Sequence, residues 1–337
     1  MTATLPFPRW LSQALPEPGA WPVWTVRSVH LLRLTGADSL RFVHDQTTQD
    51  LSSAPPGCLR RSCAVTATAR LTALLDVLVE KHAARLVVLA GDGPALHQRF
   101  DRHLFPADRV TLLPTVQAQQ VSLLGEAAAA LLAAQGIAMD PTGAGWCSVA
   151  LDNDRALLLR GTGFGNGVPG SRLLLPESHP LPPWLHHCPR LTGAQVELLR
   201  LQQGMPTWPG EINDAFNPFE LGLAEAVALN KGCYLGQEVL ARLVTYDGVK
   251  QQLRLWRSSI AFESLSEDNV IQGEDGARAG VVTSRSVLDT GSAGLAVVRR
   301  AWLGAPTLRL GHGTISLSLP GAAQFPPSTN SVSAADP

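Results

Sequence analysis

The chain has 337 residues, 45% hydrophobic and 16% charged, and its 27 Lys and Arg nearly balance its 28 Asp and Glu. This length predicts two or three domains, and the balanced charge argues against direct nucleic-acid binding, which depends on a basic excess. No apolar run has the character of a ~20-residue membrane span, and the first residues match neither a signal nor a transit peptide. We therefore expect a soluble, cytoplasmic protein.

The first third of the sequence predicts strands and helices with short connections. Residues 1–22 contain five prolines and are expected to form an extended arm. Apolar spacing and turn residues then predict a strand from residue 24, a helix from 39 capped by Asp38 or Thr35, strands over 71–80 and 84–91, and a helix over 91–104.

The sequence from residue 119 onward predicts a second unit of strands and helices, followed by short strands. The expected elements are a strand over 119–125, a helix over 126–136, strands over 155–160 and 171–176, a helix over 197–204 and a further helix starting at 217–220. From residue 253 the short strands indicate a small closed sheet, and residues 321–337 have the composition of a disordered tail.

Two weak motifs are interpreted structurally. The glycines of segment 161–167 do not have dinucleotide-loop spacing and precede a strand, so we expect a hairpin turn there. The five cysteines are scattered, and Cys58 and Cys63 lack the second close pair of a zinc site. No metal site is predicted.

The segment around Cys233 is the most distinctive part of the sequence. Gly232 and Gly236 bracket a Cys-Tyr pair, and a helix is predicted to follow, with an i,i+4 acid–base pair at Glu238 and Arg242. Cys233 thus precedes a helix N-terminus and is close to Lys231, and both favour the thiolate. The alternative interpretation is a buried free cysteine beside a tight turn.

Residues 231–238 resemble the K-G-C-Y-x-G-Q-E motif of the folate-binding YgfZ-type proteins. These proteins belong to the superfamily of the glycine-cleavage T-protein, a tetrahydrofolate-dependent aminomethyltransferase. Supporting similarities lie at residues 35–50, 200–206, 280–284 and 296–299.

The resemblance implies an α+β fold, a T-protein-like three-domain ring around a folate cavity with a small C-terminal β-barrel. The implied division is a folate-binding domain over 23–118 and 190–250, an inserted domain over 119–189 and a barrel over 251–320. It implies tetrahydrofolate or a derivative as cofactor and a role in iron–sulfur cluster assembly or repair. The partners would be client or assembly proteins, such as the radical-SAM tRNA methylthiotransferase, without direct nucleic-acid or membrane contact.

On this resemblance Cys233 is the functional thiol. The residues expected to serve the folate site are Asp76, Gln202, Lys231, Gly232, Tyr234, Gly236, Gln237, Glu238 and Arg242.

Three departures from the T-protein pattern weaken an aminomethyltransferase interpretation. Leu74 stands where the T-protein has its acid, with Asp76 two residues on; Gln202 replaces a Glu, and Ala69 replaces a Gly. A one-carbon transferase remains the alternative, with Asp76 or Glu211 as the carboxylate near the folate amine. A folate-free interaction scaffold is the second alternative.

Overall fold

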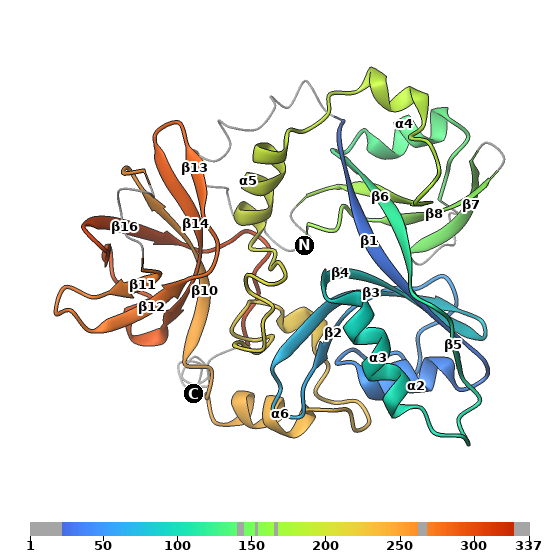
Figure 1. Ribbon diagram of the computed structural model, residues 1–337, viewed down its shortest axis with the longest axis horizontal. Coiled ribbons are helices and arrows are strands. Elements are labelled where there is room, and N and C mark those ends of the chain that lie inside the picture. The colour runs from blue at the N-terminus through green and yellow to red at the C-terminus, as the bar shows by residue number, and fades with distance from the viewer. Residues whose placement is uncertain (1–21, 140–144, 152–153, 165–167, 262–267, 327–337) are drawn as a thin grey trace, which may run out of the picture.

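The computed structural model describes residues 22–139, 145–151, 154–164, 168–261 and 268–326. Two β-sheets and the helices around them surround a central region (Figure 1). The arm predicted for residues 1–22 lies outside the described residues except for Pro22, as do residues 327–337 of the predicted tail.

The larger sheet is antiparallel and has the order β2-β3-β4-β1-β6-β9-β8-β7, with β5 paired to β1. Its strands are β1 Val23–Thr35, β2 Leu59–Val65, β3 Leu71–Glu80, β4 Ala83–Gly91, β5 Thr111–Leu112, β6 Val116–Leu124, β7 Trp146–Leu151, β8 Asp154–Arg160 and β9 Gly170–Pro176. The division predicted at residue 119 falls inside β6, so the sheet runs without interruption through both predicted domains.

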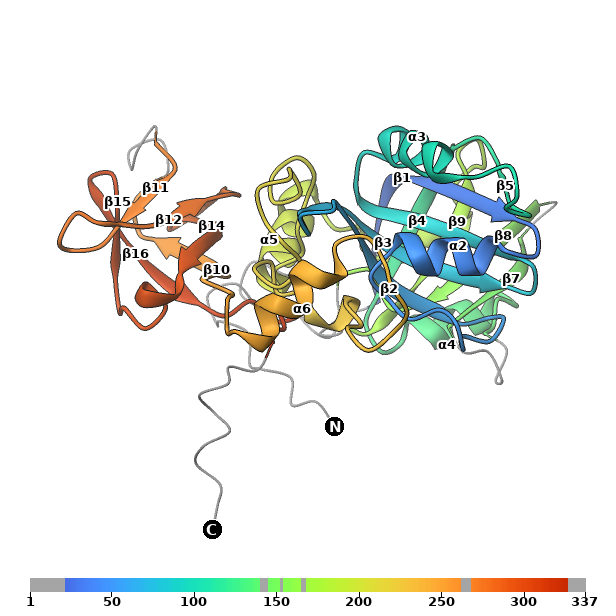
Figure 2. The ribbon, with the colours of Figure 1, turned by 90° about the horizontal axis from the view of Figure 1, so that it is seen from below.

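Helices cover the outer face of this sheet (Figure 2). Helices α2 Ser39–Gln46 and α3 Gly93–His103 pack on the β1–β4 half, where Phe42 and Phe100 meet edge to face at 5.7 Å. Helix α4 Ala128–Ala134 packs on the β6–β9 half. Since alternate residues of a strand face opposite sides, every second side chain is left for the inner face.

The inner face shares one buried cluster with α5 Gly193–Gln203 and with residues of the second sheet. Leu74 and Leu78 of β3 share one buried cluster with Leu201 of α5 and Leu253 of the second sheet. Two parts of the chain that are distant in sequence therefore enclose the centre of the molecule, where the candidate site lies.

The second sheet is the predicted small barrel. Its strands are β10 Gln251–Ser258, β11 Val270–Gln272, β12 Arg278–Val282, β13 Ser286–Leu288, β14 Gly291–Arg299, β15 Leu308–Leu310 and β16 Gly313–Ser318. The pairing of β10 with β14 closes the ring β10-β16-β15-β11-β12-β14, and β13 lies beside β14. Trp256 fills its interior, and the prediction of a C-terminal barrel is confirmed.

The predicted helix start at 217–220 is wrong. The Asn217 side chain accepts hydrogen bonds from the N–H groups of Phe219 and Glu220, each at 3.0 Å, and the Glu220 carboxylate accepts from the Asn217 N–H at 2.9 Å. This capping pattern is followed by turns only, and the next α-helix is α6 Gln237–Thr245. Short 3₁₀ turns lie at Pro183–His187, Ala224–Ala226 and Arg300–Trp302.

The disordered tail predicted from residue 321 is wrong for residues 321–326, which are packed. The N–H groups of Gly321 and Ala322 donate to the carbonyl oxygens of Gln202 and Gln203 at 2.8 and 3.1 Å, at the end of α5. Backbone hydrogen bonds to the neighbouring loops therefore order a segment whose composition alone suggested disorder.

Candidate functional site

The loop before α6 folds back on itself. Gly236 has φ +80°, and a Cβ there would lie 2.6 Å from the carbonyl oxygen of Thr66, so the position requires glycine. The Gln237 side chain accepts from the N–H of Tyr234 at 3.3 Å and donates to the carbonyl oxygen of Lys231 at 3.1 Å. These contacts give the motif glycine and glutamine a structural role.

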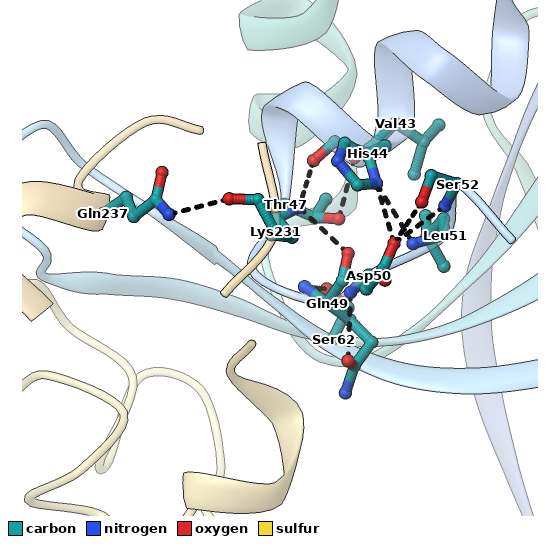
Figure 3. A network of polar contacts seen from close by, with 10 residues as sticks. All are labelled: Val43, His44, Thr47, Gln49, Asp50, Leu51, Ser52, Ser62, Lys231 and Gln237. Atoms are coloured by element: carbon teal, nitrogen blue, oxygen red, sulfur yellow. Dashed lines mark hydrogen bonds and ion pairs between the residues drawn. The ribbon is translucent and has the colours of Figure 1, made fainter. Parts of the chain in front are cut away.

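Lys231 joins this loop to α2 (Figure 3). Its Nζ donates to the carbonyl oxygens of His44, Thr47 and Gln49, the last two at 2.7 and 2.9 Å, and lies 4.5 Å from the centre of the Tyr234 ring. Burial lowers the pKa of Lys231 to about 8, which leaves it charged at neutral pH, the form that can donate three hydrogen bonds. Lys231 therefore holds the C-terminal end of α2.

Cys233 is exposed on the same loop, three residues before the cap residue of α6, Gly236. The Lys231 ammonium expected to favour its thiolate is committed to the end of α2. Glu238 and Arg242 form the predicted ion pair on the exposed side of α6, where it serves the helix.

Two adjoining cavities lie at the inner face of the large sheet and share Thr162, Gly163 and Met205 in their walls. The first, cavity 1, has a volume of about 300 Å³. Its wall is largely apolar and aromatic, with Val29, Leu74, Val88, Leu89, Phe164, Met205, Pro206 and Trp208. Both cavities are in the size range of small-molecule sites.

Polar side chains also line cavity 1: Arg27, Ser28, His30, Gln120, Thr162, Glu197, Arg200 and Thr207. Gln120 is buried, and its side-chain oxygen has no hydrogen-bond partner among the described residues. Glu197 and Arg200 pair with each other through two bonds of 2.8 and 2.6 Å. His30 adds an imidazole to the wall. Cavity 1 thus combines apolar and aromatic side chains with the Gln120 side-chain oxygen, an acceptor without a partner among the described residues.

Cavity 2 has a volume of about 380 Å³ and a wall rich in arginine: Arg60, Arg61, Arg160 and Arg172. Asp76 of β3 lies between two of them, 3.1 Å from Arg61 Nε and 2.7 Å from Arg172 Nη1. Burial alone would raise the pKa of Asp76, but the charges of Arg61 and Arg172 outweigh it and lower the pKa to about 2. Asp76 is therefore a fixed carboxylate near neutral pH.

The other predicted carboxylate, Glu211, is also committed. It is fully buried and accepts hydrogen bonds from the backbone and hydroxyl of Thr207, at 2.9 and 3.1 Å, and from the hydroxyl of Ser284. Arg200 lies 3.6 Å from it. This network fixes the loop beneath cavity 1 to the barrel.

The structure separates the predicted site residues into groups. Asp76 lines cavity 2, whereas Gln202 lines neither cavity; it is buried, and its side-chain oxygen has no partner among the described residues. The motif residues Lys231, Gly232, Cys233, Tyr234, Gly236, Gln237, Glu238 and Arg242 line neither cavity. Lys231 is linked to the wall of cavity 2 indirectly, because its ammonium donates to the carbonyl oxygen of Gln49, which lines that cavity.

Sequence reasoning missed the arginines of cavity 2 and the segment between the cavities. The hairpin predicted over residues 161–167 is confirmed by the antiparallel pairing of β8 with β9; residues 165–167 of the turn itself lie outside the described residues. Thr162 and Gly163 in that turn line both cavities. Charged residues inside otherwise apolar strands, such as Arg172 in β9, were the available signal.

The described residues contain neither a metal-ligand cluster nor a membrane-spanning helix. Within the described ranges no three His, Cys, Asp or Glu side chains are grouped so that they could hold a metal ion. Among the helices of those ranges, none has both the length and the apolar character to cross a bilayer.

The chain resembles aminomethyltransferases. No protein-family profile matches it. It is 29% identical to a putative chloroplastic transferase of Arabidopsis thaliana over 326 residues, covering 90% of this chain and 72% of that protein. It is 26% identical to an aminomethyltransferase of Pelodictyon phaeoclathratiforme over 216 residues, covering 60% of this chain and 59% of that protein.

The fold comparison covers nearly the whole chain. The crystal structure of the glycine cleavage system aminomethyltransferase T from Bartonella henselae matches with a TM-score of 0.73, covering 91% of this chain and 89% of that one, at 20% identity. The predicted fold class is confirmed. The narrower resemblance to YgfZ-type proteins stays a prediction.

Proposed function

We propose, from the aminomethyltransferase T fold of this chain, that it binds a tetrahydrofolate at its central cavities. The observation that carries this proposal is the pairing of an apolar, aromatic cavity with an arginine-lined one across Thr162 and Gly163. A folate has the matching shape, because a flat heterocycle lies at one end and carboxylates at the other. Sites for such ligands combine apolar walls with a few placed polar groups.

Cavity 1 fits the heterocycle. A pterin carries N–H donors on its edge, and the buried Gln120 oxygen is an acceptor without a partner among the described residues. Leaving such an acceptor unsatisfied costs about 1–3 kcal/mol, so a donor there is favourable. Trp208, 51% exposed in the cavity wall, offers a flat face for stacking.

The carboxylates near the cavities favour a folate-dependent factor over a turnover enzyme. A base for the folate amine needs a pKa near the working pH. The pKa of Asp76 is about 2, and Glu211 and Glu197 are each held by arginine or hydroxyl donors. The exposed Cys233 is accessible to another protein.

The role we propose is support of iron–sulfur cluster assembly or repair in client enzymes. Cys233 would be the thiol that meets the client or assembly protein, and any connection to tRNA would pass through that client. A single thiol is too few to hold a cluster alone, since such clusters use about four ligands.

Calorimetric titration with tetrahydrofolate and its 5-formyl derivative tests the binding proposal. We expect binding to the native chain and about tenfold weaker binding to Trp208→Ala, because one aromatic stacking face is lost. Phe105→Ala is the control, since Phe105 is 73% exposed and lines neither cavity. No binding of either folate would retire the proposal and leave the folate-free scaffold.

The thiol is tested by complementation. In a strain lacking this protein, Cys233→Ser should fail to restore the activity of a cluster-dependent client enzyme. Cys147→Ser is the control, because Cys147 is a half-buried free cysteine on β7. Full restoration by Cys233→Ser would contradict the role given to the thiol.

The second candidate is a one-carbon transferase acting on folate. Its support is the sequence similarity to an aminomethyltransferase, together with Glu197 and His30 in the wall of cavity 1. The assay is formation of methylene-tetrahydrofolate from a protein-bound aminomethyl donor. Formation of methylene-tetrahydrofolate by the native chain, lost in Glu197→Gln, would establish this candidate. No product formation by the native chain would retire it.

A further inference from the structure

Cavity 2 carries more positive charge than its own carboxylates balance. Its wall contains four arginines and two acids, Asp76 and Glu225. Asp76 is shared by Arg61 and Arg172, and Glu225 accepts a hydrogen bond from Gln324.

The two remaining arginines have no side-chain partner among the described residues. Arg60 and Arg160 are exposed, and their side chains make no hydrogen bond or ion pair with any residue that the structure describes. They come from different strands, β2 and β8, yet line the same cavity. A ligand in cavity 2 can therefore meet two guanidinium groups that the protein does not use.

Buried arginines beside the cavity add positive charge, which the carboxylate of Asp76 opposes. Arg172 is 1% exposed, and burial lowers its pKa although Asp76 opposes the shift. On the cavity 1 side, burial and the charge of Arg172 lower the pKa of Arg27 to about 10. Buried charges such as those of Arg172 and Arg27 favour a nearby group of opposite charge, and a guanidinium fork binds carboxylate and phosphate oxygens best.

The position of the arginines relates them to cavity 1. A Cβ at residue 163 would lie 3.3 Å from Gln120 Nε2 and 3.4 Å from Arg172 Nη1. Gly163, which lines both cavities, thus brings the backbone close to the Gln120 side chain of cavity 1 and to the buried guanidinium of cavity 2. Because the two cavities share Thr162, Gly163 and Met205, a ligand whose ring lies at Gln120 can extend its far end toward the arginines, and negative charge on that end favours this direction.

We propose that cavity 2 is an oxyanion subsite for the carboxylates of the glutamate end of the folate, including a γ-linked oligoglutamate tail. This inference rests on the proposed folate function and adds the ligand's orientation and the form it prefers. Arg60 and Arg160 supply the free donors, and Arg172 and Arg61, held by Asp76, supply the positive field.

The test is a calorimetric series with three ligands: tetrahydropteroate, which has no glutamate, tetrahydrofolate, and its triglutamate. We expect the full-length native chain to bind the triglutamate at least tenfold more tightly than tetrahydropteroate. Arg160→Gln and Arg60→Gln should each reduce this advantage several-fold, since each removes one charge-assisted contact. Arg102→Gln on α3, exposed and outside both cavities, should keep the full advantage.

The outcomes separate this inference from the function on which it rests. Equal binding of tetrahydropteroate and triglutamate would overturn the subsite and leave the folate function standing. Failure of all three ligands to bind would retire the folate function itself. Binding of inorganic phosphate that depends on Arg160, without any gain from glutamate, would assign the arginines to a phosphate-bearing ligand and overturn the glutamate assignment. Unchanged thermal midpoints establish that the arginine variants are folded.

Discussion

The loop that contains Lys231 and the wall of cavity 2 both carry positively charged side chains, but the two regions differ in the partners of those charges. Lys231 meets three carbonyl oxygens of one helix end, so the donors of its ammonium are used within the chain. In cavity 2, Arg61 and Arg172 share one carboxylate, and no partner of Arg60 or Arg160 is found in the described ranges. A cation that is fully satisfied by the protein holds structure, whereas an unsatisfied one is available to a ligand.

This difference changes the meaning of the conspicuous motif. Residues 231–238 form a continuous and distinctive signature, yet their contacts serve the attachment of one loop to α2. The candidate ligand groups are dispersed over β2, β3, β8 and β9. Cys233 is the exception within the motif, because it is exposed and unpaired in a loop that the other motif residues fix.

Asp76→Asn is the strongest test of the contrast between the Lys231 loop and cavity 2. Removal of one charge from a buried ion pair costs about 3–5 kcal/mol, because the partner charges remain uncompensated, and here two arginines lose their shared carboxylate. We expect the free energy of unfolding, measured by urea denaturation, to fall by that amount. Asp101→Asn is the control, an exposed acid on α3. A variant as stable as the native chain would show that cavity 2 does not need an anion.

Acid titration tests the same carboxylate without a mutation. The folded-state pKa of Asp76 is lowered from 3.8 to about 2, so its stabilisation is present above about pH 4 and is lost as the pH falls through 2. The shift corresponds to about 2 kcal/mol, at about 1.4 kcal/mol per pKa unit. The stability difference between the native chain and Asp76→Asn should shrink between pH 5 and pH 2. A constant difference over this range would contradict the assignment.

Lys231→Met tests the loop. The methionine keeps the apolar contact with Tyr234 but removes all three hydrogen bonds, and we expect a loss of about 2 kcal/mol in unfolding free energy. Folate binding should change little, because Lys231 lines neither cavity. Lys81→Met, at an exposed turn, is the control. Loss of folate binding in a variant that remains folded would place Lys231 in the ligand site. Lys231 would then bind ligand as the arginines of cavity 2 are proposed to do.

The sequence predicted most of the fold because most of its elements carry local signals. Strands such as β3 are nearly continuous apolar runs, and helix α5 ends at Gly204 with φ +69°, as the glycine indicated. Strand β2 was missed because Arg60 and Arg61 interrupt its apolar pattern. The partner of Arg61, Asp76, lies on the neighbouring strand, so the reason for a charge in a buried strand is not local.

The candidate site was less predictable for the same reason. The arginines of cavity 2 come from three separate strands, and only the folded sheet brings them together. Gln202 was expected at the folate on the basis of a linear match, but the end of α5 is covered by residues 321 and 322. Ala69, where the resemblance predicts glycine, has φ +60°, so the backbone retains a glycine-like conformation without the glycine.

The two motif glycines provide the finest test of the loop. At Gly236 an alanine adopts an unfavourable left-handed conformation and contacts the Thr66 carbonyl oxygen, which should cost about 1–2 kcal/mol. At Gly232 the nearest atom, His44 Nε2, lies 3.6 Å from the position of a Cβ, which is an ordinary contact. Gly232→Ala should therefore leave thermal stability nearly unchanged while Gly236→Ala lowers it. Should Gly232→Ala alone abolish complementation of the client enzyme at full stability, the surface beside Cys233 must be one that a partner approaches closely, and the function of the motif would be confined to that exposed segment.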